Sequence, residues 1–359
     1  MKLELTCFDV EGTPTQMGEA LGVAARDRIE AMIARRLEVA HDFFKEQGQG
    51  AVEDLLRHGA ASLDCLESWD FKGWEEFVAT AKGADVAPEV LHAAANYTDM
   101  RDLVCCRPIN NPADEGCTSV AVPGNRTKSG MVLVGQTWDL HLLDLETVVA
   151  VHRLPAEQPE TWSVTVAGGP TLIGMNEHGL WVGTTNIQID GVQDGVGYLN
   201  VLHRAIRCRA REDAALRVQS APRSAAHTFL VADAGGAIEL ECSALTTVRR
   251  EMRSEPMVRT NHCLDARHIP SEAEQPTPSS LARFARATDL LGRHDVDEDM
   301  IRVLMTDRDD GVDSINRWPE DGEQTATNAC LIGCPDRRRL EACRGSADRG
   351  QWEHLGFRA

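Results

Sequence analysis

The sequence has no excess of positive charge. Of its 359 residues, 37 are Lys or Arg and 56 are Asp or Glu, which gives a formal net charge of −19. Proteins that bind nucleic acids or anionic membranes usually present a basic face. The composition therefore argues against both kinds of partner, although it leaves room for a local basic pocket.

Long apolar runs are also absent. No stretch reaches the roughly 18 apolar residues of a membrane span, and the opening stretch MKLELTCFDVE has no apolar signal core. We therefore expect a cytoplasmic protein. A hydrophobic share of 42% is typical of a globular protein with a sizeable core, and 359 residues suffice for one large domain or two small ones.

Several motifs are missing as well. There is no Gly-x-Gly-x-x-Gly after a strand, no Walker loop and no Gly-x-Ser-x-Gly elbow. The cysteine count of 11 is odd, which in a chain without a signal peptide indicates reduced thiols. Cys330 and Cys334 have only a loose metal-like spacing, and nothing completes a zinc set. We expect neither a cofactor nor a metal.

What the sequence does contain is a hairpin pattern around Cys117. Two runs of β-forming residues, 118–123 and 130–138, flank a turn segment rich in Gly, Asn and Ser. If Val122 faces Met131, Cys117 lies roughly opposite Gln136 and within about 7 Å of Asp139. A cysteine and a carboxylate would then meet at one end of the hairpin.

The run GCTS at 116–119 and the run GQTWD at 135–139 resemble the acyl-CoA:6-aminopenicillanic acid acyltransferase family, which belongs to the N-terminal nucleophile (Ntn) hydrolases. Further segments resemble the family at 95–99, 174–180 and 259–262. The resemblance implies an α+β fold with the four-layer αββα sandwich and the nucleophile at a strand end.

The family resemblance also implies self-processing. Members are made as inactive precursors that cut themselves before a cysteine, here the Gly116–Cys117 bond. Residues 1–116 would form a helical α chain ending in a cleavage linker. Residues 117–359 would form the catalytic β chain, and both would remain one globular unit.

Processing would supply the base that the thiol needs. A thiol with a pKa near 8.5 is mostly protonated at neutral pH. Cleavage at Gly116 frees an α-amino group on Cys117, with a reference pKa of about 7.7–8.0, that can accept the thiol proton. Gly116 tolerates the backbone geometry that attack on its carbonyl demands.

Three further side chains complete the candidate site. Asp139 would orient the amino group or polarise the peptide, its alternative being a turn residue. Asn261 matches the family's oxyanion donor, its alternative being a strand-end residue. Arg283 resembles an arginine near the nucleophile of bile-salt-type hydrolases, although its pattern favours a surface cation. No late arginine is found at 324–328, where the penicillin enzyme is expected to have one.

Two histidines are compatible with a different catalytic mechanism. His178 lies in a predicted hairpin turn and His262 beside Asn261, so either could be the base of an unprocessed Cys/His hydrolase. A non-enzymatic scaffold is a third reading. It is disfavoured because Gly116, Cys117 and their expected partners occur together.

Helical periodicity predicts a helical region before Cys117, with the segment 100–116 as a loop. Ser279 or Ser280 is expected to cap the last helix of the chain. The expected helices are 14–46, 50–66, 73–82, 88–97, 198–211 and 281–292, and a final strand pair is expected at 326–333 and 339–344.

The substrate is expected to be a small N-acyl amide that is hydrolysed, with acyl-CoA as the alternative donor. A CoA enzyme should hold nucleotide phosphates with clustered cations or helix N-termini. The only tidy basic stripe, Arg204, Arg207 and Arg211, is typical of a solvated face. The sequence is compatible with a homo-oligomer but does not fix one.

Overall fold

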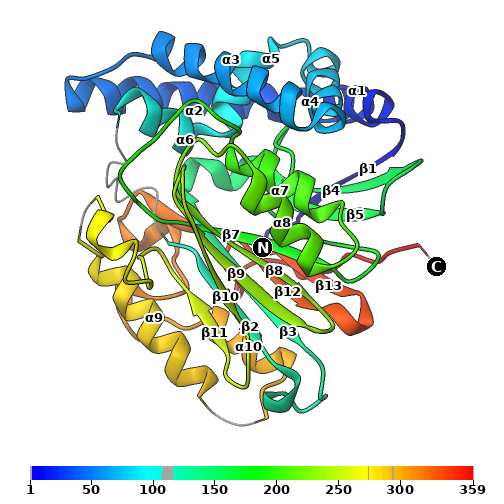
Figure 1. The fold of residues 1–359 in the computed structure, drawn as a ribbon, viewed down its shortest axis with the longest axis vertical. Helices are drawn as coiled ribbons and strands as arrows, with labels where there is room; N and C mark the ends of the chain where they lie inside the picture. The colour runs from blue at the N-terminus through cyan, green and yellow to red at the C-terminus, as the bar shows by residue number, and fades with distance from the viewer. Residues whose placement is uncertain (1, 107–115, 274, 293–294, 359) are drawn as a thin grey trace.

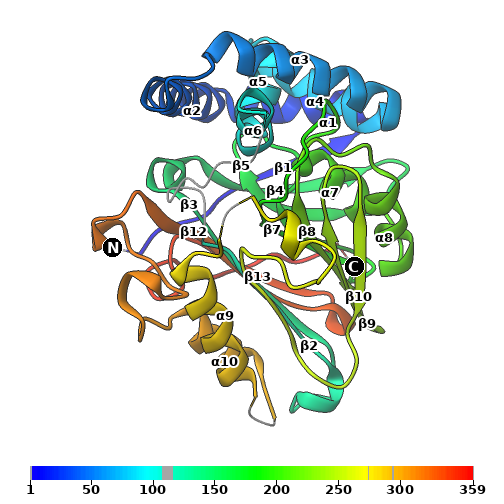
Figure 2. The ribbon, with the colours of Figure 1, turned by 60° about the vertical axis from the view of Figure 1, so that its left-hand side comes forward.

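Two β-sheets packed face to face form the centre of the protein (Figure 1). Helices α7 (Tyr198–Ile206) and α8 (Arg211–Ser220) lie on one outer side, and α9 (Pro278–Leu291) and α10 (Glu298–Met305) lie on the other (Figure 2). This is the α+β class and the αββα layering that the family resemblance implied. The computed structural model describes residues 2–106, 116–273, 275–292 and 295–358.

The larger sheet is antiparallel except at one edge, where β1 (Thr6–Gly12) pairs in parallel with β4 (Val148–Pro155). The segment before Cys117 therefore contributes a strand as well as helices, so it is not purely helical as expected. Beyond β4 the strands follow in the order β5 (Thr161–Val166), β6 (Ile173–Asn176), β7 (Trp181–Asn186), β8 (His227–Asp233), β9 (Gly236–Cys242) and β10 (Thr247–Glu251).

The smaller sheet is antiparallel throughout its described pairs and contains the predicted hairpin and the predicted final strand pair. Its order is β11 (Met257–Arg259), β2 (Thr118–Val122), β3 (Leu133–His141), β12 (Thr325–Cys334), β13 (Arg339–Arg344) and β14 (Glu353–His354). One apolar core fills the space between the two sheets, and a second core lies between the smaller sheet and helices α9 and α10.

The hairpin register differs from the expected one. Val122 pairs two residues further along β3 than the predicted Met131, because residues 124–126 form a short 3-10 helix that lengthens the turn. The register prediction was therefore wrong by two residues. The shift brings Cys117, just before β2, closer along the ladder to Asp139.

Helices upstream of Cys117 lie at one end of the molecule, beside β1, β4 and β5 (Figure 1). None of the described helices combines the length and apolarity needed to cross a membrane. The upstream helices are α1 (Pro14–Ala24), α2 (Arg26–Gln47), α3 (Val52–Trp69), α4 (Phe71–Ala84), α5 (Pro88–Ala95) and α6 (Tyr97–Val104).

The helix expected at 14–46 is in fact two helices that meet at Ala25, where φ is −106° and ψ is 10°. Helix α1 packs closely on α4. A Cβ on Gly18 would lie 2.8 Å from the Cβ of Ala79, and one on Gly22 would lie 2.7 Å from the nitrogen of Ala84. The glycines therefore permit this contact, and the chain changes direction before α2.

Two other helix boundaries differ from expectation. Helix α6 occupies residues that were expected to begin a loop at 100, while 107–115 lie outside the described residues. The predicted helix 198–211 ends at Ile206, and a separate helix follows. Helix α6 is buried along almost its whole length, so its apolar and polar positions do not alternate as on a surface helix.

The three arginines of the expected basic stripe do not share a helix. Arg204 stacks over an indole ring 4.3 Å away, Arg207 pairs with Asp70, and Arg211 pairs with Asp233. The interpretation as a solvated face was therefore wrong. These side chains join neighbouring elements instead.

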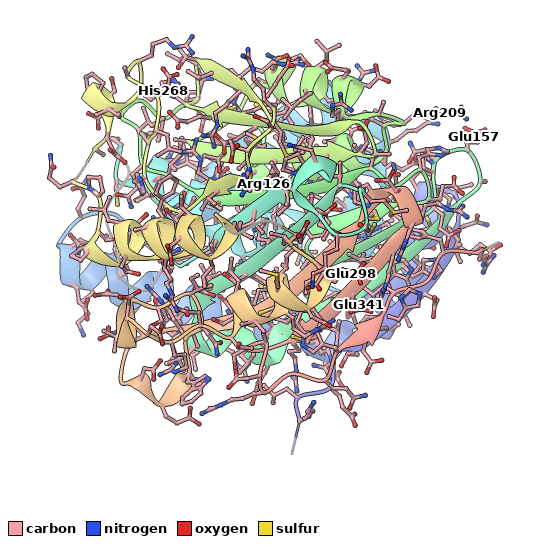
Figure 3. All side chains as sticks on the ribbon, turned by 90° about the horizontal axis from the view of Figure 1, so that it is seen from below. Arg126, Glu157, Arg209, His268, Glu298 and Glu341 are labelled. Carbon is pink, nitrogen blue, oxygen red and sulfur yellow. The ribbon has the colours of Figure 1, made fainter. Side chains whose placement is uncertain are left out.

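Polar contacts tie the layers together. Gln136 of β3 donates through Nε2 to the carbonyl of Thr184 in β7 at 2.5 Å, which links the two sheets. On the outer side of the smaller sheet, Glu298 of α10 and Glu341 of β13 lie close together (Figure 3). Arg339 bonds to both carboxylates, at 2.7 and 2.6 Å.

Candidate functional site

Cys117 lies immediately before β2 and is 8% exposed. Its Sγ is 4.0 Å from the carbonyl oxygen of Asp139. The preceding residue is close to the same aspartate, since a Cβ on Gly116 would lie 2.5 Å from Asp139 Oδ2 and 2.8 Å from its Cγ. The need for glycine at 116 therefore comes from this close approach.

Asp139 lies near the end of β3 and is fully buried. Burial raises the pKa of its carboxyl to about 6, although the charges of Arg317 and Arg283 act in the opposite direction. Burial and the charge of Asp139 together raise the pKa of the Cys117 thiol to about 12. The thiol therefore needs a base before it can react.

Arg317, which sequence analysis did not single out, also lies near Asp139. Its Nε is 3.9 Å from Asp139 Oδ2, and its guanidinium also bonds to the hydroxyl of Ser279. The backbone nitrogen of Arg317 donates to Thr327 Oγ1 at 3.0 Å, and the backbone nitrogen of Thr327 donates to the carbonyl of Arg317 at 3.1 Å. Because Arg317 lies in a loop without periodicity, only its nearness in sequence to 324–328 could have pointed to it.

Arg283 is completely buried, so its interpretation as a surface cation was wrong. It projects inward from α9 and donates through Nη1 to the carbonyl oxygen of Cys117 at 2.6 Å. Nη1 also lies 3.3 Å from Thr118 Oγ1, and Nη2 donates to Asn261 Oδ1 at 2.9 Å. The arginine thus joins the start of β2 to the segment that carries Asn261.

Asn261 has a fixed amide orientation. Its Oδ1 accepts from Arg283, while its Nδ2 donates to the carbonyl of Asn186 at 3.0 Å. Its backbone nitrogen donates to Ser280 Oγ at 2.9 Å. Among the hydrogen bonds of the described residues, Nδ2 uses only one of its two protons. Ser280 therefore holds this segment, and Thr277, not Ser279 or Ser280, caps α9.

The two candidate histidines differ in their surroundings. His262 Nδ1 is 2.8 Å from Ser280 Oγ, and burial together with nearby arginines lowers its pKa to about 4. His178 lies in the turn between β6 and β7, 4.0 Å from Glu177. Among the hydrogen bonds of the described residues, neither histidine bonds to Cys117.

The structure thus brings Gly116, Cys117 and Asp139 together with Asn261 and Arg283. Within the described parts of the chain, no group of three or more His, Cys, Asp or Glu side chains is arranged to hold a metal ion. The arrangement offers a thiol, a buried carboxylate, an amide donor and two cations, which suits nucleophilic attack on a carbonyl group.

Solved structures similar to this chain include conjugated bile acid hydrolase from Clostridium perfringens, at 11% identity and a TM-score of 0.45, covering 67% of this chain and 97% of that chain. Penicillin V acylase from Agrobacterium tumefaciens is 15% identical with a TM-score of 0.45, covering 67% and 86%. No curated protein matches the sequence.

The family described as acyl-coenzyme A:6-aminopenicillanic acid acyl-transferase matches residues 125–348. This match covers more than half of the chain, including β3, Asn261 and Arg283. The chain therefore belongs to the acyl-coenzyme A:6-aminopenicillanic acid acyl-transferase family.

Proposed function

We propose that this protein is a self-processing cysteine amidohydrolase of the Ntn type, cleaved before Cys117. Residues 1–116 would become the α chain and residues 117–359 the catalytic β chain of one globular unit. The observation that carries the proposal is the convergence of four residues from separate parts of the chain: Cys117, Asp139, Asn261 and Arg283.

In the processing step, the Cys117 thiol attacks the carbonyl carbon of Gly116. A thioester forms as the peptide C–N bond breaks, and the proton lost by the thiol ends on the new α-amino group. Water then hydrolyses the thioester and frees the carboxyl group of Gly116. The carboxylate of Asp139, which lies against Gly116, would polarise this peptide or take the thiol proton.

In turnover, the α-amino group of Cys117 accepts the thiol proton and sulfur adds to the substrate carbonyl. The free Nδ2 proton of Asn261 donates to the oxyanion. Arg283 acts as a positioning residue, because it holds both the Asn261 amide and the Cys117 carbonyl. The leaving amine takes the proton, and water then releases the acid.

The proposed substrate is a small N-acyl amide. The strongly acidic composition and the engagement of Arg207 and Arg211 in ion pairs favour an amide over a nucleotide-bearing thioester. The family description favours a second candidate, transfer from acyl-CoA to an amine. Both reactions would share the same acyl-enzyme on Cys117.

Purified protein is expected to give two copurifying fragments, residues 1–116 and 117–359, on a denaturing gel and by intact mass. They should stay together because buried pairs such as Arg36–Asp144, at 2.9 Å, join them. Cys117→Ala should remain one folded, inactive chain. As controls, His178→Ala and His262→Ala should still be cut. A single full-length band in active protein would refute processing.

Gly116→Ala is expected to slow processing by about 10-fold or more, because the new Cβ must displace the Asp139 carboxylate and misplace the reacting groups. The measurement is the rate of fragment appearance in freshly purified precursor. Gly356→Ala is the matched control, since its Cβ would meet nothing closer than 3.7 Å. Equal rates for both variants would contradict the role of the Gly116–Asp139 contact.

Processing is expected to accelerate as pH rises through about 6, the pKa of Asp139 in the uncut chain. Below this pH the carboxyl is protonated and cannot accept a proton, and above it the carboxylate is available. The rate should level off above neutrality. Asp139→Asn should lose the rise. If the processing rate of Asp139→Asn still rises with pH in the same way, the rise is due to the titration of another group.

The processed enzyme is expected to hydrolyse members of a panel of N-acyl amides faster than it transfers acyl groups from acyl-CoA esters to amines. Both the acid and the amide products should be followed by mass spectrometry. A transfer rate from acyl-CoA above every hydrolysis rate would favour the acyltransferase reading. Loss of both activities in Cys117→Ala would tie either reaction to this thiol.

A further inference from the structure

Asp99, on helix α6 upstream of Cys117, bonds to two groups downstream of it. Its Oδ1 is 2.6 Å from His227 Nε2, and its Oδ2 accepts from the backbone nitrogen of Tyr198 at 3.0 Å. Asp99 is 1% exposed. A carboxylate so buried depends on such partners, so α6 is tied to the starts of both α7 and β8.

The upstream segment also caps α7. Gly197, at the N-cap position, has no side chain to bond to the first free N–H groups of the helix. Asn96 Oδ1 accepts from Leu199 at 3.2 Å, and Asp99 accepts from Tyr198. A Cβ on Gly197 would lie 2.9 Å from Asn96 Nδ2, which explains the glycine.

The imidazole of His227 is held between two groups. Asp99 bonds to one edge, and the ring of Tyr198 stacks on its face with centroids 4.3 Å apart and planes 19° apart. His227 is the first residue of β8 and pairs with Asn186, the last residue of β7. The contacts of His227 with Asp99 and Tyr198 therefore fix the position of this end of the β7–β8 strand pair.

The group that orients the side-chain amide of Asn261 lies at this end of the β7–β8 strand pair. The carbonyl of Asn186 accepts from Asn261 Nδ2 at 3.0 Å, and Arg283 donates to Asn261 Oδ1 at 2.9 Å. A continuous set of contacts thus runs from Asp99 through His227 and Asn186 to Asn261.

We infer that Asp99 is a positioning residue for the Cys117 site: through His227 and the paired ends of β7 and β8 it places the carbonyl of Asn186 that orients the Asn261 amide. This inference rests on the proposed function, in which Asn261 donates to the oxyanion. It makes the segment upstream of the cleavage bond a permanent part of the active site.

A double-mutant cycle tests the inference in the processed enzyme. Asn261→Ala is expected to lower kcat by about 10² to 10³, the effect of removing an oxyanion donor. Asp99→Asn should lower kcat about 10-fold with little change in KM, because a misplaced donor loses transition-state binding. In the Asn261→Ala background, Asp99→Asn should cost less than about 2-fold more.

Asp102→Asn is the matched control, because Asp102 is a buried carboxylate on the same helix that pairs with Arg101 at 2.8 Å. Any loss of activity it causes through stability should be the same in both backgrounds. If Asp99→Asn lowers kcat by the same factor in the wild-type and Asn261→Ala backgrounds, the inference is overturned. If Asp99→Asn does not fold, His227→Gln breaks the same path and replaces it in the cycle.

A crystal structure of Asp99→Asn gives a readout independent of turnover. The Asn186 carbonyl should move away from Asn261 Nδ2 while the Arg101–Asp102 pair remains. An unchanged bond near 3.0 Å would overturn the inference. If the wild-type enzyme hydrolyses no N-acyl amide, or if Asn261→Ala leaves turnover unchanged, the proposed function fails. The crystal structure of Asp99→Asn still decides whether Asp99 positions the side-chain amide of Asn261.

Discussion

The buried guanidinium of Arg283 is the constraint on which the rest of the site depends. A cation without exposure must find partners inside the protein, because leaving an ion unpaired there costs several kcal/mol. Its partners fix the start of β2, the segment after β11 and helix α9 relative to one another. They are Cys117 O, Thr118 Oγ1, Asn261 Oδ1 and Ser279 Oγ.

A second constraint joins the parts of the chain on either side of Cys117. Arg36 of α2 pairs with Asp144 at 2.9 Å, and Glu76 of α4 pairs with Arg153 at 2.6 Å, with all four side chains nearly buried. Losing one partner of a buried pair typically costs about 3–5 kcal/mol. The upstream helices are thus held by charge as well as by the shared apolar core.

The sequence predicted those contacts of the candidate site that depend on local pattern. The hairpin placed Cys117 near Asp139, and the family segments singled out Asn261. The register was wrong because apolar alternation cannot reveal that residues 124–126 coil within the turn. Arg283 was misread because a helix of mixed composition does not show which of its cations faces inward.

The remaining contacts could not be predicted because they are long-range, although segment 95–99, which contains Asp99, resembles the family. Arg317 lies in an irregular loop, and Asp99 reaches His227 across a separation of 128 residues. Such pairs leave no trace in periodicity, since each residue alone is an ordinary polar side chain. The two-helix break at Ala25 has the same origin, because it follows from packing on α4 and not from a breaker residue.

The raised pKa of Cys117 has a consequence for the reaction of this thiol with reagents other than a substrate. Alkylating agents and oxidants react with thiolates, and a thiol of pKa about 12 is ionised to only on the order of 10⁻⁵ at pH 7. In the folded, intact chain, electrophiles and oxidants should therefore modify the thiol of Cys117 more slowly than an ordinary cysteine.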